Sequence, residues 1–115
     1  MRDTIVNEDR RKDDVPPWDV KYTGRAAKQK KDLPLDIANA LLALVKELQR
    51  YGPVRNNWPH YGKIMGRKKN VDIRHCHLHK GHPTYVAAWK VDKKNKKMEI
   101  IHVSTHEKTD YGSLG

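Results

Sequence analysis

Residues 35–51, LDIANALLALVKELQRY, decide the fold more than any other stretch of the chain. Their apolar side chains recur at intervals of three and four, which gives a helix one continuous apolar face. These positions are Ile37, Leu41, Leu44, Val45 and Leu48. Gly52-Pro53 ends the pattern, because glycine suits a helix C-cap and proline cannot continue a helix. The sequence therefore predicts an amphipathic helix that needs an apolar surface to cover.

That surface is predicted to come from three strands that follow the helix. Residues 71–79 alternate between two faces, and residues 84–91 are apolar and aromatic, as in a central strand. Residues 98–105 form the last strand, and the charged residues 92–97 form the hairpin loop before it. The predicted arrangement is an antiparallel meander with the helix on one of its faces.

The N-terminal part of the chain adds a strand and a basic segment. Trp18–Tyr22 alternates as a short strand does, and residues 25–31 can form one or two helical turns. Residues 1–17 carry few apolar side chains and are predicted to be a flexible arm, and the turn-rich residues 54–66 a loop. We therefore predict an α+β domain over residues 18–115. It has a small antiparallel sheet, made of the N-terminal strand and the meander, and one or two helices packed on one face.

The composition points to a nucleic-acid partner. The 115 residues suit one domain, and 24 Lys and Arg against 14 Asp and Glu give a formal net charge of +10. Such an excess attracts polyanions, chiefly nucleic acid, with an acidic protein or anionic lipid as alternatives. No apolar run approaches the ~20 residues that cross a bilayer, the first residues are charged, and Cys76 is the only cysteine. We expect a cytoplasmic protein with no membrane partner and no internal disulfide.

Seven histidines are the main source of candidate chemistry. Residues two apart on a strand share a face of the sheet. One such set is His75, His77 and His79, and another is His102, Ser104 and His106. Because an unperturbed imidazole has a pKa of about 6.5, several of them on one face can donate and accept protons near neutral pH.

A face of this kind suits RNA cleavage by transesterification. The reaction needs a base for the 2′-hydroxyl, an acid for the leaving 5′-oxygen and cations for the developing negative charge. Histidine with lysine or arginine supplies all three, so we expect no metal and no cofactor. Two alternatives are that single histidines are ordinary solvated residues, or that residues 75–79 bind zinc without the closed Cys/His set of a structural site. Cys76 shares its face with Leu78 and is expected to be buried rather than nucleophilic.

Three segments carry a resemblance to a known family. Residues 25–63 resemble the helical hairpin and following loop of RelE-like toxins, and residues 77–86 resemble the turn between their second and third strands. Residues 104–111 resemble their C-terminal end, most nearly the Gly-Thr-His ending of the YafQ branch. The resemblance covers about residues 18–111 and rests on order and spacing together.

The resemblance to the RelE/ParE superfamily implies the toxin of a type II toxin–antitoxin pair. Such a toxin cuts messenger RNA in the ribosomal decoding site, and its protein partner is a cognate antitoxin. Two alternatives stay open: a ParE-like inhibitor of DNA gyrase without nuclease activity, and a catalytically inert basic RNA-binding relative.

The resemblance also implies roles for single residues. His106 matches the C-terminal catalytic histidine, and Thr84 stands where the branch has an acidic residue, so that acid is absent here. The implied catalytic set is His106, His79, His82 and Tyr111, with Tyr111 stacking on the scissile nucleotide. The RNA-binding set, completed by basic residues of the loop and turn, is His75, His77, Tyr85, Lys80, Arg67, Lys68 and Lys69.

Overall fold

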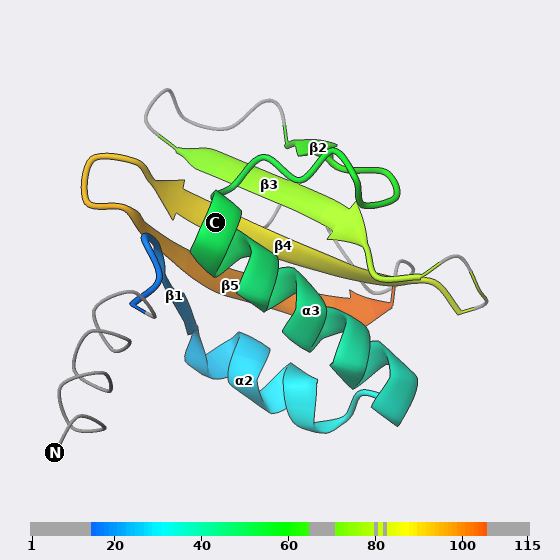
Figure 1. Ribbon diagram of the computed structural model, residues 1–115. Coiled ribbons are helices and arrows are strands. Elements are labelled where there is room, and N and C mark those ends of the chain that lie inside the picture. Colours follow the sequence, from blue (N-terminus) through cyan, green and yellow to red (C-terminus); the bar gives the residue numbers. More distant parts are fainter. Residues whose placement is uncertain (1–14, 65–70, 80, 82, 106–115) are drawn as a thin grey trace, which may run out of the picture.

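The computed structural model describes residues 15–64, 71–79, 81 and 83–105 of the chain. Its elements are β1 (Asp19–Tyr22), α2 (Gly24–Lys31), α3 (Leu35–Tyr51), β2 (Gly62–Lys63), β3 (Asp72–His77), β4 (Tyr85–Asp92) and β5 (Lys97–Thr105). Both helices lie on the same side of the sheet (Figure 1). The α+β class and the packing of the helices on one face are therefore confirmed. Neither described helix is long and apolar enough to span a membrane.

The sheet has the strand order β1-β5-β4-β3-β2. The meander of β3, β4 and β5 is antiparallel, as predicted. The prediction of an antiparallel N-terminal strand is wrong, because β1 pairs with β5 in parallel and the sheet is mixed. Alternation in residues 18–22 indicates a strand and its buried face, but its direction depends on the pairing partner. A second difference is β2, which pairs with β3 inside the segment predicted to be a loop and is too short to show a period.

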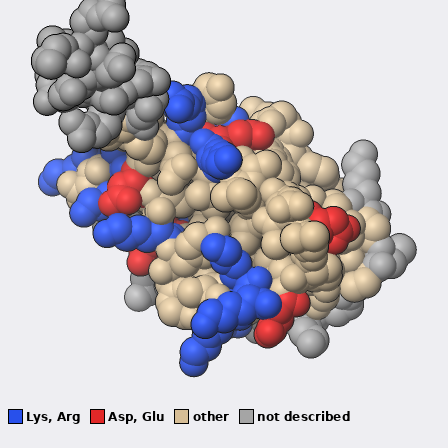
Figure 2. Space-filling view, turned by 60° about the horizontal axis from the view of Figure 1, so that its bottom comes forward, with Lys and Arg blue, Asp and Glu red and all other residues tan. Residues whose placement is uncertain are grey.

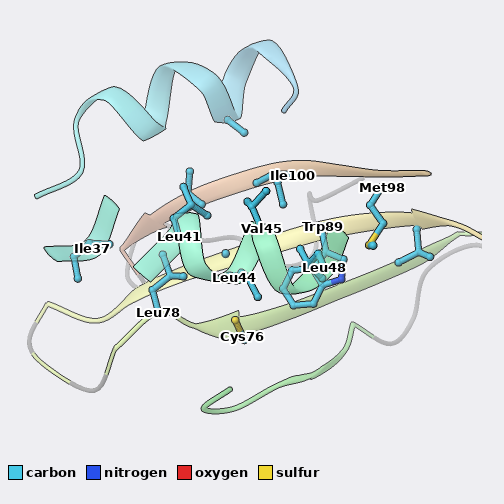
Figure 3. Close-up of a cluster of buried hydrophobic side chains, with 14 residues drawn as sticks. Ile37, Leu41, Leu44, Val45, Leu48, Cys76, Leu78, Trp89, Met98 and Ile100 are labelled. Carbon is cyan, nitrogen blue, oxygen red and sulfur yellow. The ribbon is translucent and has the colours of Figure 1, made fainter. Parts of the chain in front are cut away.

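The main core lies between α3 and the sheet. Figure 3 shows the apolar side of α3 facing residues of the three long strands, such as Cys76, Trp89 and Ile100. The predicted bounds of α3 and its five apolar positions are confirmed, since all five are buried. Full burial of a Leu or Ile side chain stabilises the fold by about 1.5–3 kcal/mol, so this contact dominates the stability of the domain.

The opposite face of the sheet, which we call the open face, carries a smaller apolar cluster. Ile64, Ile73 and Ala88 are buried there, with Val71 and Ile101 packed against them. Ile73 thus lies on the face away from Cys76, as the alternation of β3 predicts. The open face is therefore apolar near its centre, and its two ends carry polar side chains.

A β-bulge in β5 changes which residues reach the open face. Trp89 pairs with Ile100 while Ala88 pairs with His102, so Ile101 is the extra residue. A bulge re-aims the side chains that follow it. As a result Val103 joins Ile100 in the main core, and His102 stands opposite Ala88 on the open face.

Candidate functional site

Pairing across β3, β4 and β5 sets two rows of side chains at one end of the open face. His75 pairs with Ala88 and Ala88 with His102, while His77 pairs with Val86 and Val86 with Ser104. We call these six residues the histidine rows. Neighbouring strands lie ~4.8 Å apart, so the outer side chains of a row start about 10 Å from each other. Each row thus holds polar groups at both ends of a short apolar side chain.

The loop between α3 and β2 closes the β3 end of these rows. The amide of His77 donates to the carbonyl of Pro59 at 2.8 Å, and the ring of His60 stacks on that of His77 with centroids 4.2 Å apart. Gly62 pairs with His75, and a Cβ there would lie 3.7 Å from Nε2 of His75. His60 is exposed whereas His77 is half-buried, so solvent reaches this pair from the side of His60.

One carboxylate of α3 holds that loop in place. Oε1 of Glu47 accepts hydrogen bonds from Arg55 at 3.1 Å and from Asn57 and Trp58 at 2.9 Å. Burial by itself would raise the pKa of Glu47, but the three bonds together lower it. The carboxylate therefore stays ionised and fixes the loop that carries His60.

His79 and Tyr85 lie apart from the histidine rows. β3 ends at His77, and the ring of His79 lies 5.7 Å from that of Tyr85, which packs against the main core. Nδ1 of His79 is buried and has no hydrogen-bond partner among the described residues, and a Cβ on Gly81 would lie 3.0 Å from its Nε2. The alternation that groups His79 with His75 and His77 does not reach it, because the strand has already ended.

At the β5 end of the rows, a side chain of α2 meets His102. Nε2 of Gln29 lies 3.4 Å from Nδ1 of His102, and Oε1 of Gln29 accepts from the amide of Val103 at 2.9 Å. His102 is only 1% exposed. Burial lowers the pKa of His102, and the charge of Arg25 lowers it further. His102 is therefore neutral near pH 7.

Cys76 lies between His75 and His77 in sequence but on the other side of the sheet. It is fully buried in the main core, as predicted, and burial raises the pKa of its thiol to about 12. It therefore cannot join the histidines as a zinc ligand or act as a thiolate near neutral pH. Across the described ranges, no three His, Cys, Asp or Glu side chains converge as metal ligands do.

The opposite end of the open face carries two rows of alternating charge. Register aligns Asp19, Lys97 and Asp92 in one row and Lys21, Glu99 and Lys90 in the next. We call these six residues the charge rows, and they line a shallow hollow. Each charge has opposite charges beside it, so the rows are neutral in sum. Figure 2, which shows one side of the molecule, likewise has basic groups with acidic side chains beside them.

The structure thus places only part of the candidate site. Of the catalytic and RNA-binding sets it describes His75, His77, His79 and Tyr85. The remaining candidates lie outside the described residues: His106, His82, Tyr111, Lys80, Arg67, Lys68 and Lys69. The stack of His60 on His77 and the contacts of Gln29 were not predicted from the sequence, since both depend on how distant segments meet.

No family model and no curated protein matches the sequence, whereas solved structures match the fold. A chain of the archaeal RelE–RelB complex from Pyrococcus horikoshii superposes with a TM-score of 0.65 and 17% identity, over 81% of this chain and 99% of that one. YoeB of Staphylococcus aureus, solved as a dimer, gives a TM-score of 0.57 and 15% identity, over 78% and 98%.

A third structure is a metal-bound toxin from Helicobacter pylori, with a TM-score of 0.57 and 17% identity over 81% of this chain and 99% of that one. At identities this low the likeness concerns the fold. The chain has the fold of RelE-type toxins, which confirms the fold implied by the resemblance in its sequence.

Proposed function

We propose that this protein is a RelE-type toxin that cleaves messenger RNA in the ribosomal decoding site by acid–base catalysis without a metal. The observation that carries the proposal is a RelE-type fold whose open face ends in two rows with three histidines and no carboxylate. Such an end can receive RNA phosphates through the half-buried imidazoles of His75 and His77.

In this reaction a base takes the proton of the 2′-hydroxyl, whose oxygen attacks the adjacent phosphorus. The 5′-oxygen leaves with a proton from an acid, and a 2′,3′-cyclic phosphate remains. We assign acid and base to His106 and to His79 or His82, and stacking to Tyr111, following the family resemblance. His75 and His77 are assigned to the RNA phosphates, together with Lys80 and Arg67–Lys69. Tyr85 is assigned to stacking on a nucleobase of the RNA. His102 is neutral and buried, so it is assigned no proton transfer.

The proposed protein partner is a cognate antitoxin. One structural neighbour was solved as a RelE–RelB complex. The net charge of +10 favours an acidic partner as well as RNA. Action on ribosomes places the protein in the cytoplasm.

Primer extension on a reporter messenger after brief induction tests the proposal. The parent should cut within translated codons, and His106→Ala should not. Lys90→Ala is the matched control, because it removes a charge from the charge rows of the same sheet and should leave the cuts unchanged. Growth arrest without cuts would favour the gyrase inhibitor, and normal growth without cuts would favour the inert RNA-binding relative.

A further inference from the structure

The outer edge of β5 changes its partner halfway along the strand. β1 pairs with residues 97–100 of β5, which continues to Thr105. At the changeover, Thr23 donates its amide to the carbonyl of Ile100 at 3.0 Å and caps α2 with its hydroxyl. α2 then runs along the part of β5 that β1 does not reach (Figure 1). A helix therefore covers the strand edge directly after the bulge at Ile101.

Gln29 of α2 bonds to this edge as a neighbouring strand would. Its Oε1 accepts from the amide of Val103, so its Nε2 must be the atom that faces Nδ1 of His102. Nδ1 of His102 accepts that bond, which leaves the ring proton of a neutral imidazole on Nε2. One carboxamide thus holds two consecutive residues of β5.

The bulge decides on which face of the sheet the side chain of each of these two residues lies. With the bulge, His102 and Ser104 reach the open face and Val103 the core. Slippage of a strand by one residue turns every later side chain to the other face. A bond from α2 to Val103 opposes such slippage, because in the slipped register another residue would stand opposite Gln29.

We propose that Gln29 is a positioning residue that holds β5 in its bulged register and so keeps His102 and Ser104 in the histidine rows. Its effect on RNA cleavage rests on the proposed function, whereas its effect on β5 does not. Gln29 acts through Val103 and His102. The competing explanation is that Gln29 adds only general stability to the contact between α2 and the sheet.

The test compares Gln29→Ala and Gln29→Glu with the control Gln49→Ala, a Gln-to-Ala change on α3. In Gln29→Ala the amide of Val103 should exchange with solvent about tenfold faster, while amides of α3 keep their rates. Backbone NOEs between Ala88 and His102 should weaken. Because His106, the proposed acid or base, directly follows Thr105 of β5 in the sequence, kcat for RNA cleavage should fall about tenfold with KM unchanged. Gln49→Ala should change none of these.

Gln29→Glu tests the two hydrogen bonds of the carboxamide separately, since it keeps the bond to Val103 and removes the bond to His102. A carboxylate still accepts from Val103, so exchange of that amide should stay close to the parent. The same carboxylate faces Nδ1 of His102 without a proton to donate, so it should raise the pKa of His102 by about 1 unit in an NMR titration, with Arg25 the charged neighbour that opposes the rise.

Two results would overturn the proposal: unchanged Val103 exchange in Gln29→Ala, or acceleration spread equally over all amides. An unchanged pKa of His102 in Gln29→Glu would also overturn it. If the parent cleaves no RNA, the proposed function fails, and the exchange, NOE and pKa measurements still decide the role of Gln29.

Discussion

The two ends of the open face share their strands but differ in how their charges are arranged. In the charge rows every Lys lies beside an Asp or Glu across the register. In the histidine rows the cross-strand neighbours of the histidines are Ala88, Val86 and, from β2, Gly62. Within the charge rows three carboxylates balance three ammonium groups, while Lys93, Lys94 and Lys96 lie in the adjoining hairpin loop. The histidine rows contain no carboxylate, so the pairing register separates a charge-balanced end of the open face from an end without acidic side chains in its rows, a difference that the net charge does not reveal.

The largest expected effect concerns the proposed catalytic role of His106. His106→Ala should lower the rate of RNA cleavage by about 10²–10⁴-fold, the usual contribution of a general acid or base. Single-turnover cleavage measures it, with Gln49→Ala on α3 as the control. Equal rates for His106→Ala and the parent would remove His106 from the mechanism.

Changing one charge at each end should alter RNA affinity in opposite directions, and by less than His106→Ala alters the cleavage rate. Ser104→Asp places a carboxylate in the row of His77 and should weaken RNA binding severalfold. The plot of log affinity against log salt should become less steep by about 0.7. Glu99→Gln leaves the charge rows with an excess of lysine and should strengthen binding. Fluorescence anisotropy at several salt concentrations measures both. A loss of affinity in both variants would contradict the comparison of the two ends.

The loop that carries His60 should respond to acid. The lowered pKa of Glu47 means that its stabilising contribution is fully present above its unfolded value of about 4.3 and is lost as pH falls through the folded value. Urea unfolding at pH 6 and at pH 3 should therefore show a loss of about 1 kcal/mol from this carboxylate. Glu47→Gln should already lack that pH-dependent part, and an equal loss in parent and variant would assign it to other groups.

The smallest expected effect concerns Cys76, which should not react with an alkylating agent in the folded protein. Cys76 separates His75 and His77 in sequence but is buried on the far side of the sheet. Iodoacetamide at pH 8 should leave the folded protein unlabelled and its RNA cleavage unchanged, because burial raises the pKa of the thiol to about 12. Labelling should appear in urea. Rapid labelling of the folded protein would place the thiol on an accessible surface.

Local pattern was enough to predict α3, because its apolar period and its Gly-Pro end are both written within residues 35–53. Alternation likewise separated His75 and His77 from Cys76. It grouped His79 wrongly with His75 and His77, because an alternating pattern does not show at which residue a strand ends.

Three features could not be predicted from the sequence for another reason: the direction of β1, the bulge at Ile101 and the contacts of Gln29. Each depends on which distant segment lies alongside, and a bulge adds one residue without disturbing the pattern around it. The candidate site was therefore predicted as a set of residue types, while its register came only from the structure.

The pairing of β1 with β5 also limits when the fold can be completed. Thr23 bonds to Ile100, a separation of 77 residues along the chain. Contacts so distant in sequence are formed late, since a long loop must close first. During synthesis β1 and α2 have no strand to pair with or cover until residues 97–105 have left the ribosome. β1 and α2 precede the other described elements in the chain, and they are therefore among the last to reach their final positions.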